Sequence, residues 1–210
     1  MSGICAVWRE SDERGAARTL ADVTAGLTLD SSEQTATEAD ADAGVGVSAR
    51  FQTQQLHRGN GLLIACDADL QNEDELGRDL PGPRPAGTAA LMAALYQRFG
   101  NGFLEKLRGS FSVVVWDRSK RRFLAAVDPF GIGRLVYHQN GGTFMAASRV
   151  DALLHSGEVD ASINGRSILN ILNFSANLAP ETIFTSVQRV PPGCYVLASE
   201  RKVQIGRAHV

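Results

Sequence analysis

The chain has 210 residues, 44% of them hydrophobic and 21% charged, which is enough for one globular domain with a sizeable core. Its net charge of −2 offers no basic surface to a nucleic-acid backbone or an anionic membrane, so neither is expected as a partner. Three widely spaced cysteines fit neither a disulfide framework nor a zinc site, and they predict buried thiols in a cytoplasmic protein.

The amino-terminal part of the chain predicts a strand, a helix and a loop. Residues 4–8 form a short apolar run, which is typical of a strand. Leu20, Val23 and Leu27 recur at helical spacing and predict a helix. The polar residues 31–43 predict a mobile loop.

Two further strands and a helix are predicted next. Residues 45–51 and 62–68 are strand candidates, and the Gly-Asn-Gly sequence at residues 59–61 favours a hairpin turn. The two strands are therefore expected to lie in one sheet. Asn72 is expected to cap a helix over residues 73–80.

The rest of the chain alternates helices with hairpins. Leu91 and Leu95 recur at helical spacing within a predicted helix over residues 88–99. Hairpins are predicted at residues 111–127, 135–147 and 195–205, and helices at residues 150–155 and 163–174. Helices that stand apart from consecutive hairpins indicate an α+β fold with a largely antiparallel sheet.

Five short motifs follow one another in the second half of the chain. They are FLEKLRGSF at residues 103–111, DPFGI at 128–132, AAS at 146–148, ETIF at 181–184 and PPG at 191–193. Each motif alone is typical of a turn, a linker or a core strand. In this order and spacing they resemble the amino-terminal, class II glutamine amidotransferase domain of the asparagine synthetase family.

This resemblance implies a fold and a domain organisation. The fold is a four-layer αββα sandwich of the N-terminal nucleophile hydrolase class, with two antiparallel sheets between helix layers. Residues 1–204 are assigned to this domain, and residues 205–210 resemble a translated sequencing adaptor and are interpreted as a non-native tail. A carboxyl-terminal synthetase domain, which would hold ATP and magnesium, is expected as the missing partner, and the resemblance leaves a homodimer open.

The nucleophile position differs from that of active family members. Their second residue is a cysteine that attacks glutamine with its own α-amino group as the base, whereas this chain carries Ser2. A cysteine with a pKa of about 8.5 is partly ionised, whereas a serine hydroxyl must lose its proton within the transition state. Ser2 is therefore expected to be the weaker nucleophile.

The oxyanion positions differ as well. The family sequence NGEIYN aligns with residues 67–72, which assigns these positions to Asp67 and Ala68. An asparagine amide donates a hydrogen bond to a developing oxyanion, whereas a carboxylate can only accept one. Because losing one such donor lowers the rate roughly 100- to 1000-fold, Asp67 is expected to suppress glutamine hydrolysis.

The resemblance also assigns positions that would bind glutamine. The contacts to its ammonium group fall on Asp69, which is shorter than the family's glutamate, and on Thr88, which replaces an acid. Arg50 matches the arginine that holds the substrate carboxylate, and it fits an ordinary surface charge equally well.

A loop near the middle of the chain is expected to contact the synthetase domain. It contains Asp128, Phe130, Gly131 and Ile132, and it is followed by Arg134 where the family usually has proline. The sequence His57-Arg58-Gly59 resembles the family's HRGPD motif, but it stands too close to Asp67 and is interpreted as a turn.

Other kinds of chemistry find little support. The four histidines show no metal-ligand spacing, and neither a phosphate-binding loop nor the SGGxDS nucleotide motif occurs, so no metal or cofactor is expected in this chain. Asp67 and Asp69 stand at positions i and i+2 of a predicted strand and would share one face. An acid/base pair or a cation site there is kept as a weaker alternative.

Three functional hypotheses follow. The first is that the parent protein makes an amide from an ATP-activated small-molecule carboxylate, with this domain catalytically silent and ammonia or a substrate amine as the nitrogen source. The second is an active amidohydrolase that uses Ser2. The third is a stand-alone binding module without catalytic function.

Overall fold

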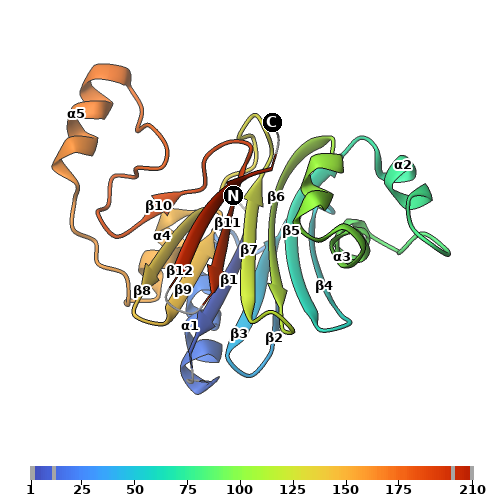
Figure 1. The fold of residues 1–210 in the computed structure, drawn as a ribbon. Helices are drawn as coiled ribbons and strands as arrows, with labels where there is room; N and C mark the ends of the chain where they lie inside the picture. The colour runs from blue at the N-terminus through green and yellow to red at the C-terminus, as the bar shows by residue number, and fades with distance from the viewer. Residues whose placement is uncertain (1–2, 11–12, 200–201, 209–210) are drawn as a thin grey trace.

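The computed structural model describes residues 3–10, 13–199 and 202–208. Within these residues, the fold contains two antiparallel sheets of six strands each (Figure 1). In spatial order, the first sheet consists of β10 (Gln188–Arg189), β8 (Val136–Asn140), β9 (Thr143–Ala147), β1 (Gly3–Arg9), β3 (Ala43–Ala49) and β2 (Gln34–Ala39). The second sheet consists of β12 (Lys202–Arg207), β11 (Cys194–Ser199), β7 (Arg122–Val127), β6 (Gly109–Asp117), β5 (Leu62–Leu70) and β4 (Gln54–Gly59).

Helices cover the outer face of each sheet. The first sheet is covered by α1 (Glu13–Leu27) and α4 (Val150–His155). The second is covered by α3 (Thr88–Phe99) and the 3-10 helix η1 (Gly100–Lys106), with α2 (Glu73–Arg78) beside them. A further helix, α5 (Gly165–Phe174), projects from the body of the sandwich (Figure 1). The four-layer αββα sandwich predicted from the sequence is confirmed.

The inner faces of the two sheets pack through large aromatic rings. Trp8 of the first sheet lies 5.9 Å from Trp116 of the second, measured between ring centroids, and Trp116 lies 5.0 Å from Phe123. Phe123 in turn contacts Phe144 of the first sheet at 5.8 Å. These four side chains are buried, and truncating such a residue costs about 3–5 kcal/mol. This aromatic layer holds the sheets together.

Residues 31–43 do not form the predicted loop. Within them, β2 pairs with β3 along its whole length, from Gln34 opposite Ala49 to Ala39 opposite Gly44. The strand lies at the edge of its sheet and is mostly exposed, so it carries Gln, Thr and Glu instead of alternating apolar residues. Its strand conformation comes from backbone pairing, which periodicity does not detect.

The expected pairing of the strands around residues 59–61 is also wrong. The turn at Asn60 and Gly61, both with positive φ, joins β5 to the preceding β4, and β3 lies in the other sheet. His57-Arg58-Gly59 is therefore the end of a strand and not a turn. The intervening β4 was missed because it consists largely of polar residues.

Two other predictions differ in detail. The Asn72 side chain does not cap α2; it donates to the Lys106 carbonyl at 2.9 Å and accepts from the Arg108 amide at 3.1 Å. Residues 205–207 continue β12 opposite β11, and Ala208 is buried against the second sheet. The non-native origin proposed for residues 205–210 stays a prediction.

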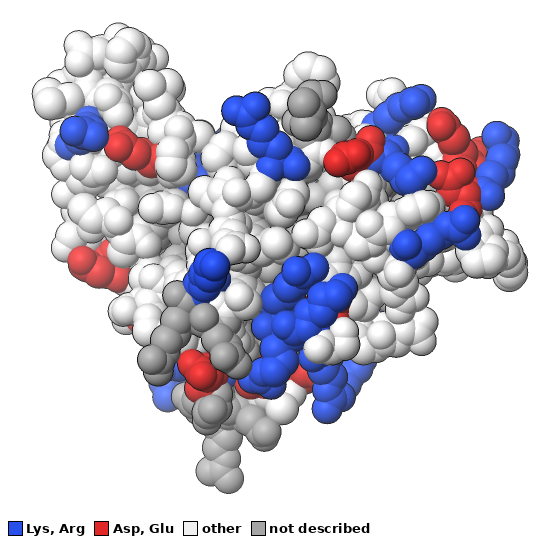
Figure 2. Space-filling view, viewed as in Figure 1, with Lys and Arg blue, Asp and Glu red and all other residues white. Residues whose placement is uncertain are grey.

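Charged side chains of both signs are intermixed on the face seen in Figure 2, with basic groups gathered over the lower ends of β6 and β7. In the turn between these strands, Arg118 pairs with Asp40, Lys120 with Asp117 and Arg121 with Asp42. The basic charge of this turn is thus balanced locally. Along the described residues, none of the helices has the length and apolar character needed to cross a membrane.

Asp117 connects the β6–β7 turn to helix α3. Its carboxylate accepts hydrogen bonds from Tyr96 Oη at 2.9 Å and Ser119 Oγ at 2.6 Å, and it pairs with Lys120 Nζ at 2.8 Å. Burial alone raises the pKa of Asp117, but the bonds from Lys120, Ser119 and Tyr96 outweigh it and lower the pKa to about 2.

This shift predicts a pH dependence of stability. The unfolded pKa is about 3.9, so the contribution of Asp117 is present above about pH 4 and is lost as the pH falls toward 2. Replacing Asp117→Asn should lower the free energy of unfolding at pH 6, and the difference from wild type should shrink between pH 4 and 2. Urea unfolding across this range measures it, and a difference that stays constant would contradict the assignment.

Candidate active site

A pocket of about 440 Å³ opens between the two sheets at one end of the sandwich. Asp67 and Asp69 of β5 contribute to its wall together with Ser110 and Ser112 of β6. The first sheet contributes Ser148, which directly follows β9. The pocket is therefore built where the inner faces of both sheets reach their end.

The alternation of side chains along β5 explains why this end is polar. Leu63 and Ala65 point into the layer between the sheets, so Asp67 and Asp69 continue the same face. Opposite them on β6 stand Ser112 and Ser110. The layer thus changes from apolar to polar within two residues, which leaves room for water or a ligand.

The carboxylate of Asp67 is oriented by Gln54. The Gln54 amide oxygen accepts from the backbone N–H groups of Arg50 and Phe51, both at 2.9 Å, which fixes the orientation of the amide. Its nitrogen then donates to Asp67 Oδ2 at 2.9 Å. Asp67 thus presents hydrogen-bond acceptors at the position where the family resemblance requires a donor.

The neighbouring Ala68 offers no free donor either. Its backbone N–H donates to the Thr53 carbonyl at 3.0 Å. Its methyl group faces away from the pocket and is buried against α3. The two residues assigned to the oxyanion positions therefore present a carboxylate and an amide that is already bonded.

The residues predicted to bind glutamine are only partly brought together. Asp69 is exposed and lines the pocket. Thr88 is buried at the start of α3, where its hydroxyl donates to Glu73 Oε1 at 2.6 Å, and it is not among the lining residues. Arg50 is exposed beyond β3, with its guanidinium 5.9 Å from the centre of the Phe51 ring, and does not line the pocket. Ser2 lies outside the described residues.

Several lining residues were not predicted as part of the site, among them Ser148, Arg134 and Arg149. Ser148 accepts from the Ile4 N–H at 3.0 Å through its hydroxyl and donates its own N–H to the Ile4 carbonyl at 2.9 Å, so it fixes the start of β1 beside the pocket. Arg134 and Arg149 add two guanidinium groups, and that of Arg149 contacts the Asp151 carboxylate. Two sequence features could have indicated these residues: the AAS motif at residues 146–148, which contains Ser148, and the replacement of the family's proline by Arg134.

The loop after β7 forms another wall of the pocket. Asp128 is fully buried, and its carboxylate accepts from the N–H groups of Phe130 at 2.9 Å, Ile132 at 3.2 Å and Gly133 at 2.6 Å. This arrangement holds the loop rigid and turns the side chains of Phe130 and Ile132 outward, 85% and 67% exposed. Gly131 has a φ of +67° and packs against Pro192.

The cysteines do not supply a replacement nucleophile. Burial raises the pKa of both Cys5 and Cys66 to about 12, so these thiols stay protonated and inert. Cys194 is half-buried in β11, away from the pocket lining. In the described part of the chain, no three His, Cys, Asp or Glu side chains are grouped so that they could hold a metal ion, so Asp67 and Asp69 have no third ligand.

Comparisons with known proteins agree with the fold and the motifs. The family described as "Glutamine amidotransferase domain" matches residues 52–208. A putative asparagine synthetase [glutamine-hydrolyzing] of Mycobacterium tuberculosis is 31% identical over 112 residues, which are 52% of this chain and 17% of that protein. Asparagine synthetase [glutamine-hydrolyzing] 3 of Bacillus subtilis is 23% identical over 157 residues, which are 72% of this chain and 25% of that protein.

One relative carries a different name, and solved structures support the fold. Amidase chyE of Penicillium rubens is 30% identical over 54% of this chain and 17% of its own length. Glutamine phosphoribosylpyrophosphate amidotransferase of B. subtilis superposes with a TM-score of 0.66 at 14% identity, over 99% of this chain and 49% of its own. The chain thus spans 17% to 25% of the length of the three curated relatives, which are the two asparagine synthetases and the amidase.

Gly133 should be intolerant of any side chain. A Cβ at this position would overlap the Phe111 carbonyl, whereas a Cβ at Gly102 would meet nothing within 4 Å. We expect Gly133→Ala to lower the free energy of unfolding by about 1–3 kcal/mol, and the control Gly102→Ala to change it by less than about 0.5 kcal/mol. Urea unfolding of both variants measures this, and equal effects would contradict the tight packing of the loop.

Proposed function

Because the chain belongs to the glutamine amidotransferase domain family, we propose that it is the glutaminase-like domain of an asparagine synthetase-type amide-forming enzyme and does not itself hydrolyse glutamine. The parent protein would join nitrogen to an ATP-activated carboxylate in the cytoplasm. The nitrogen would come from ammonia or from an amine on the substrate.

The observation that carries this proposal is the lack of an oxyanion donor at Asp67 and Ala68. A tetrahedral intermediate formed from glutamine would develop negative charge beside the Asp67 carboxylate, which Gln54 holds in place. The Ala68 N–H is directed at the Thr53 carbonyl instead. Because oxyanion donors act through fixed geometry, both features raise the barrier of the chemical step.

The nucleophile supports the same proposal. Serine at position 2 replaces the family's cysteine, and the two fully buried cysteines are protonated at neutral pH. The pocket retains Asp69 for a ligand's ammonium group, but the Thr88 hydroxyl is bonded to Glu73. Among the described residues, the pocket thus offers a carboxylate to a ligand but no oxyanion donor at Asp67 or Ala68, which supports the proposal.

Two exposed apolar surfaces support docking to a synthetase domain. One is the tip of the Asp128 loop, with Phe130 and Ile132. The other is the α5 lobe, which we define as residues 163–182 and which carries few charged side chains (Figure 2). Its apolar side chains are between 39% and 75% exposed: Ile163, Ile168, Leu169, Ile171, Leu172, Phe174 and Leu178. Apolar area of this kind marks protein interaction sites. ATP and magnesium would bind within the docked domain.

The proposal predicts a graded recovery of glutaminase activity. Wild-type protein should release no more ammonia from glutamine than a heat-inactivated sample. Ser2→Cys should remain nearly inactive, because the oxyanion position is still a carboxylate. Adding Asp67→Asn to Ser2→Cys should raise the rate roughly 100-fold by restoring one donor.

Coupled glutamate and ammonia assays measure these rates. The matched control Ser2→Ala with Asp67→Asn should be inactive, because it has the donor but no nucleophile. Ammonia release by the wild-type chain well above background would refute the silent domain and favour an active amidohydrolase that uses Ser2.

A further inference from the structure

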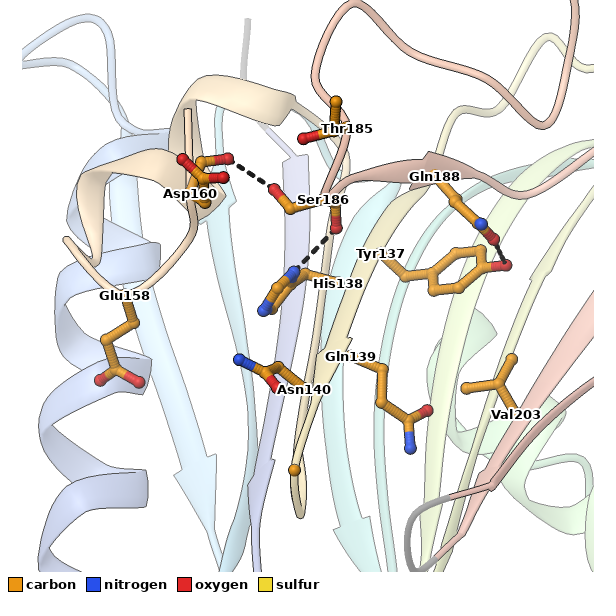
Figure 3. Close-up of a pocket in the computed structure, with 11 residues that line it drawn as sticks. Tyr137, His138, Gln139, Asn140, Glu158, Asp160, Thr185, Ser186, Gln188 and Val203 are labelled. Carbon is orange, nitrogen blue, oxygen red and sulfur yellow. Dashed lines mark hydrogen bonds between the residues drawn. The ribbon is translucent and has the colours of Figure 1, made fainter. Parts of the chain in front are cut away.

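A second, larger pocket lies at the open edge of the first sheet, away from Asp67. It has a volume of about 750 Å³, within the range of small-molecule sites. The short edge strand β10 pairs with β8 only at Val136 and Tyr137, so the end of β8 from His138 onward borders the pocket. Figure 3 shows the lining side chains on both faces of β8 and on the neighbouring segments around Glu158 and Ser186.

His138 is a buried and hydrogen-bonded polar group in this pocket. It is only 6% exposed, and its Nδ1 lies 2.8 Å from the Ser186 carbonyl. A carbonyl can only accept, so Nδ1 must carry the hydrogen, which leaves a lone pair on Nε2 in the neutral ring. Ser186 is itself held by a bond from its hydroxyl to the Asp160 carbonyl, at 2.5 Å.

The His138 Nε2 atom has no protein partner in the described part of the chain. Figure 3 shows this nitrogen on the side of the ring away from Ser186, toward the space between Asn140 and Glu158. A buried imidazole whose acceptor faces an open pocket is matched by a ligand that donates a hydrogen bond.

The pocket is also lined by the carboxylates of Glu158 and Asp160 and by the carboxamides of Gln139, Asn140 and Gln188. Glu158 accepts from Thr19 at 2.6 Å and Arg9 at 2.9 Å, both at Oε1, which leaves Oε2 for another donor. Gln139 Oε1 is buried without a partner. Asp160 adds a second carboxylate, whose Oδ1 accepts from the Ser162 N–H and hydroxyl, and the lining residues include neither Lys nor Arg. The two carboxylates and the His138 Nε2 acceptor therefore favour a ligand that donates hydrogen bonds over an anion.

We propose that this pocket binds a primary ammonium group of a small organic amine. An ammonium carries three donors and a positive charge, so it can donate to His138 Nε2 and is attracted by the carboxylates of Asp160 and of Glu158, which already pairs with Arg9. The site is separate from the pocket at Asp67 and does not depend on glutamine chemistry.

Putrescine is a suitable probe, with 1,4-butanediol as a neutral molecule of the same shape. Titrating putrescine into the 210-residue chain should shift the imidazole ¹⁵Nε2 resonance of His138 and saturate, whereas butanediol and acetate should not shift it. An unchanged resonance at saturating putrescine, or equal binding of butanediol, would overturn the proposal.

Two substitutions test the individual contacts. His138→Asn keeps an N–H that can donate to the Ser186 carbonyl but removes Nε2, and Glu158→Gln removes the charge from an exposed side chain. Each should weaken putrescine binding roughly tenfold, while His57→Asn on β4 should leave it unchanged. Calorimetry measures the affinities. If the buried substitution His138→Asn unfolds the chain, Glu158→Gln alone still tests the site. Unchanged affinity in Glu158→Gln would contradict the ammonium site.

Discussion

The packing of two antiparallel sheets face to face determines where the chemistry of this protein can lie. Because side chains alternate along a strand, every second residue of β5 enters the layer between the sheets. Trp116, Phe123 and Phe144 fill the middle of this layer, so a ligand can enter only where it ends. Asp67 and Asp69 stand at that end. The pocket is thus a consequence of strand register.

The electrostatics of the pocket follow from a few fixed bonds. Gln54 is oriented by two backbone amides, and it orients Asp67 in turn. The buried Asp128 collects amide hydrogens of its own loop and so shapes the opposite wall. A glutaminase would need donors here that turn toward the substrate. Here the Gln54 amide, the Ala68 N–H and the amides of the Asp128 loop donate to groups of the protein itself, which stabilises the walls of the pocket.

Much of the architecture was predictable from local patterns. Turn residues between apolar runs located the β6–β7, β8–β9 and β11–β12 hairpins, and helical spacing gave the observed bounds of α3. The edge strand β2 was missed because pairing with β3, and not burial, makes it a strand. β4 was missed for its polar sequence, and without it β3 and β5 were assigned to one sheet.

The candidate site was predictable only where alternation determines it. Asp67 and Asp69 follow from the period of β5, whereas the bond between Thr53 and the Ala68 amide depends on how β4 meets β5. His138 was one of four histidines without metal-ligand spacing, and its partner Ser186 lies 48 residues away in the chain. Interactions at such separations leave no periodic signal in the sequence.

The attachment of the α5 lobe has a consequence for how related proteins can diverge. Its two ends are joined by a short ladder, in which the Asn164 N–H donates to the Ile183 carbonyl at 2.9 Å and the Thr185 N–H to the Ser162 carbonyl at 3.0 Å. Ser167 closes the base from inside through the Thr182 carbonyl. A surface lobe whose two ends are fixed by hydrogen bonds can gain or lose residues at little cost in chain entropy. Evolution can therefore change the length and surface of this lobe without shifting the register of either sheet.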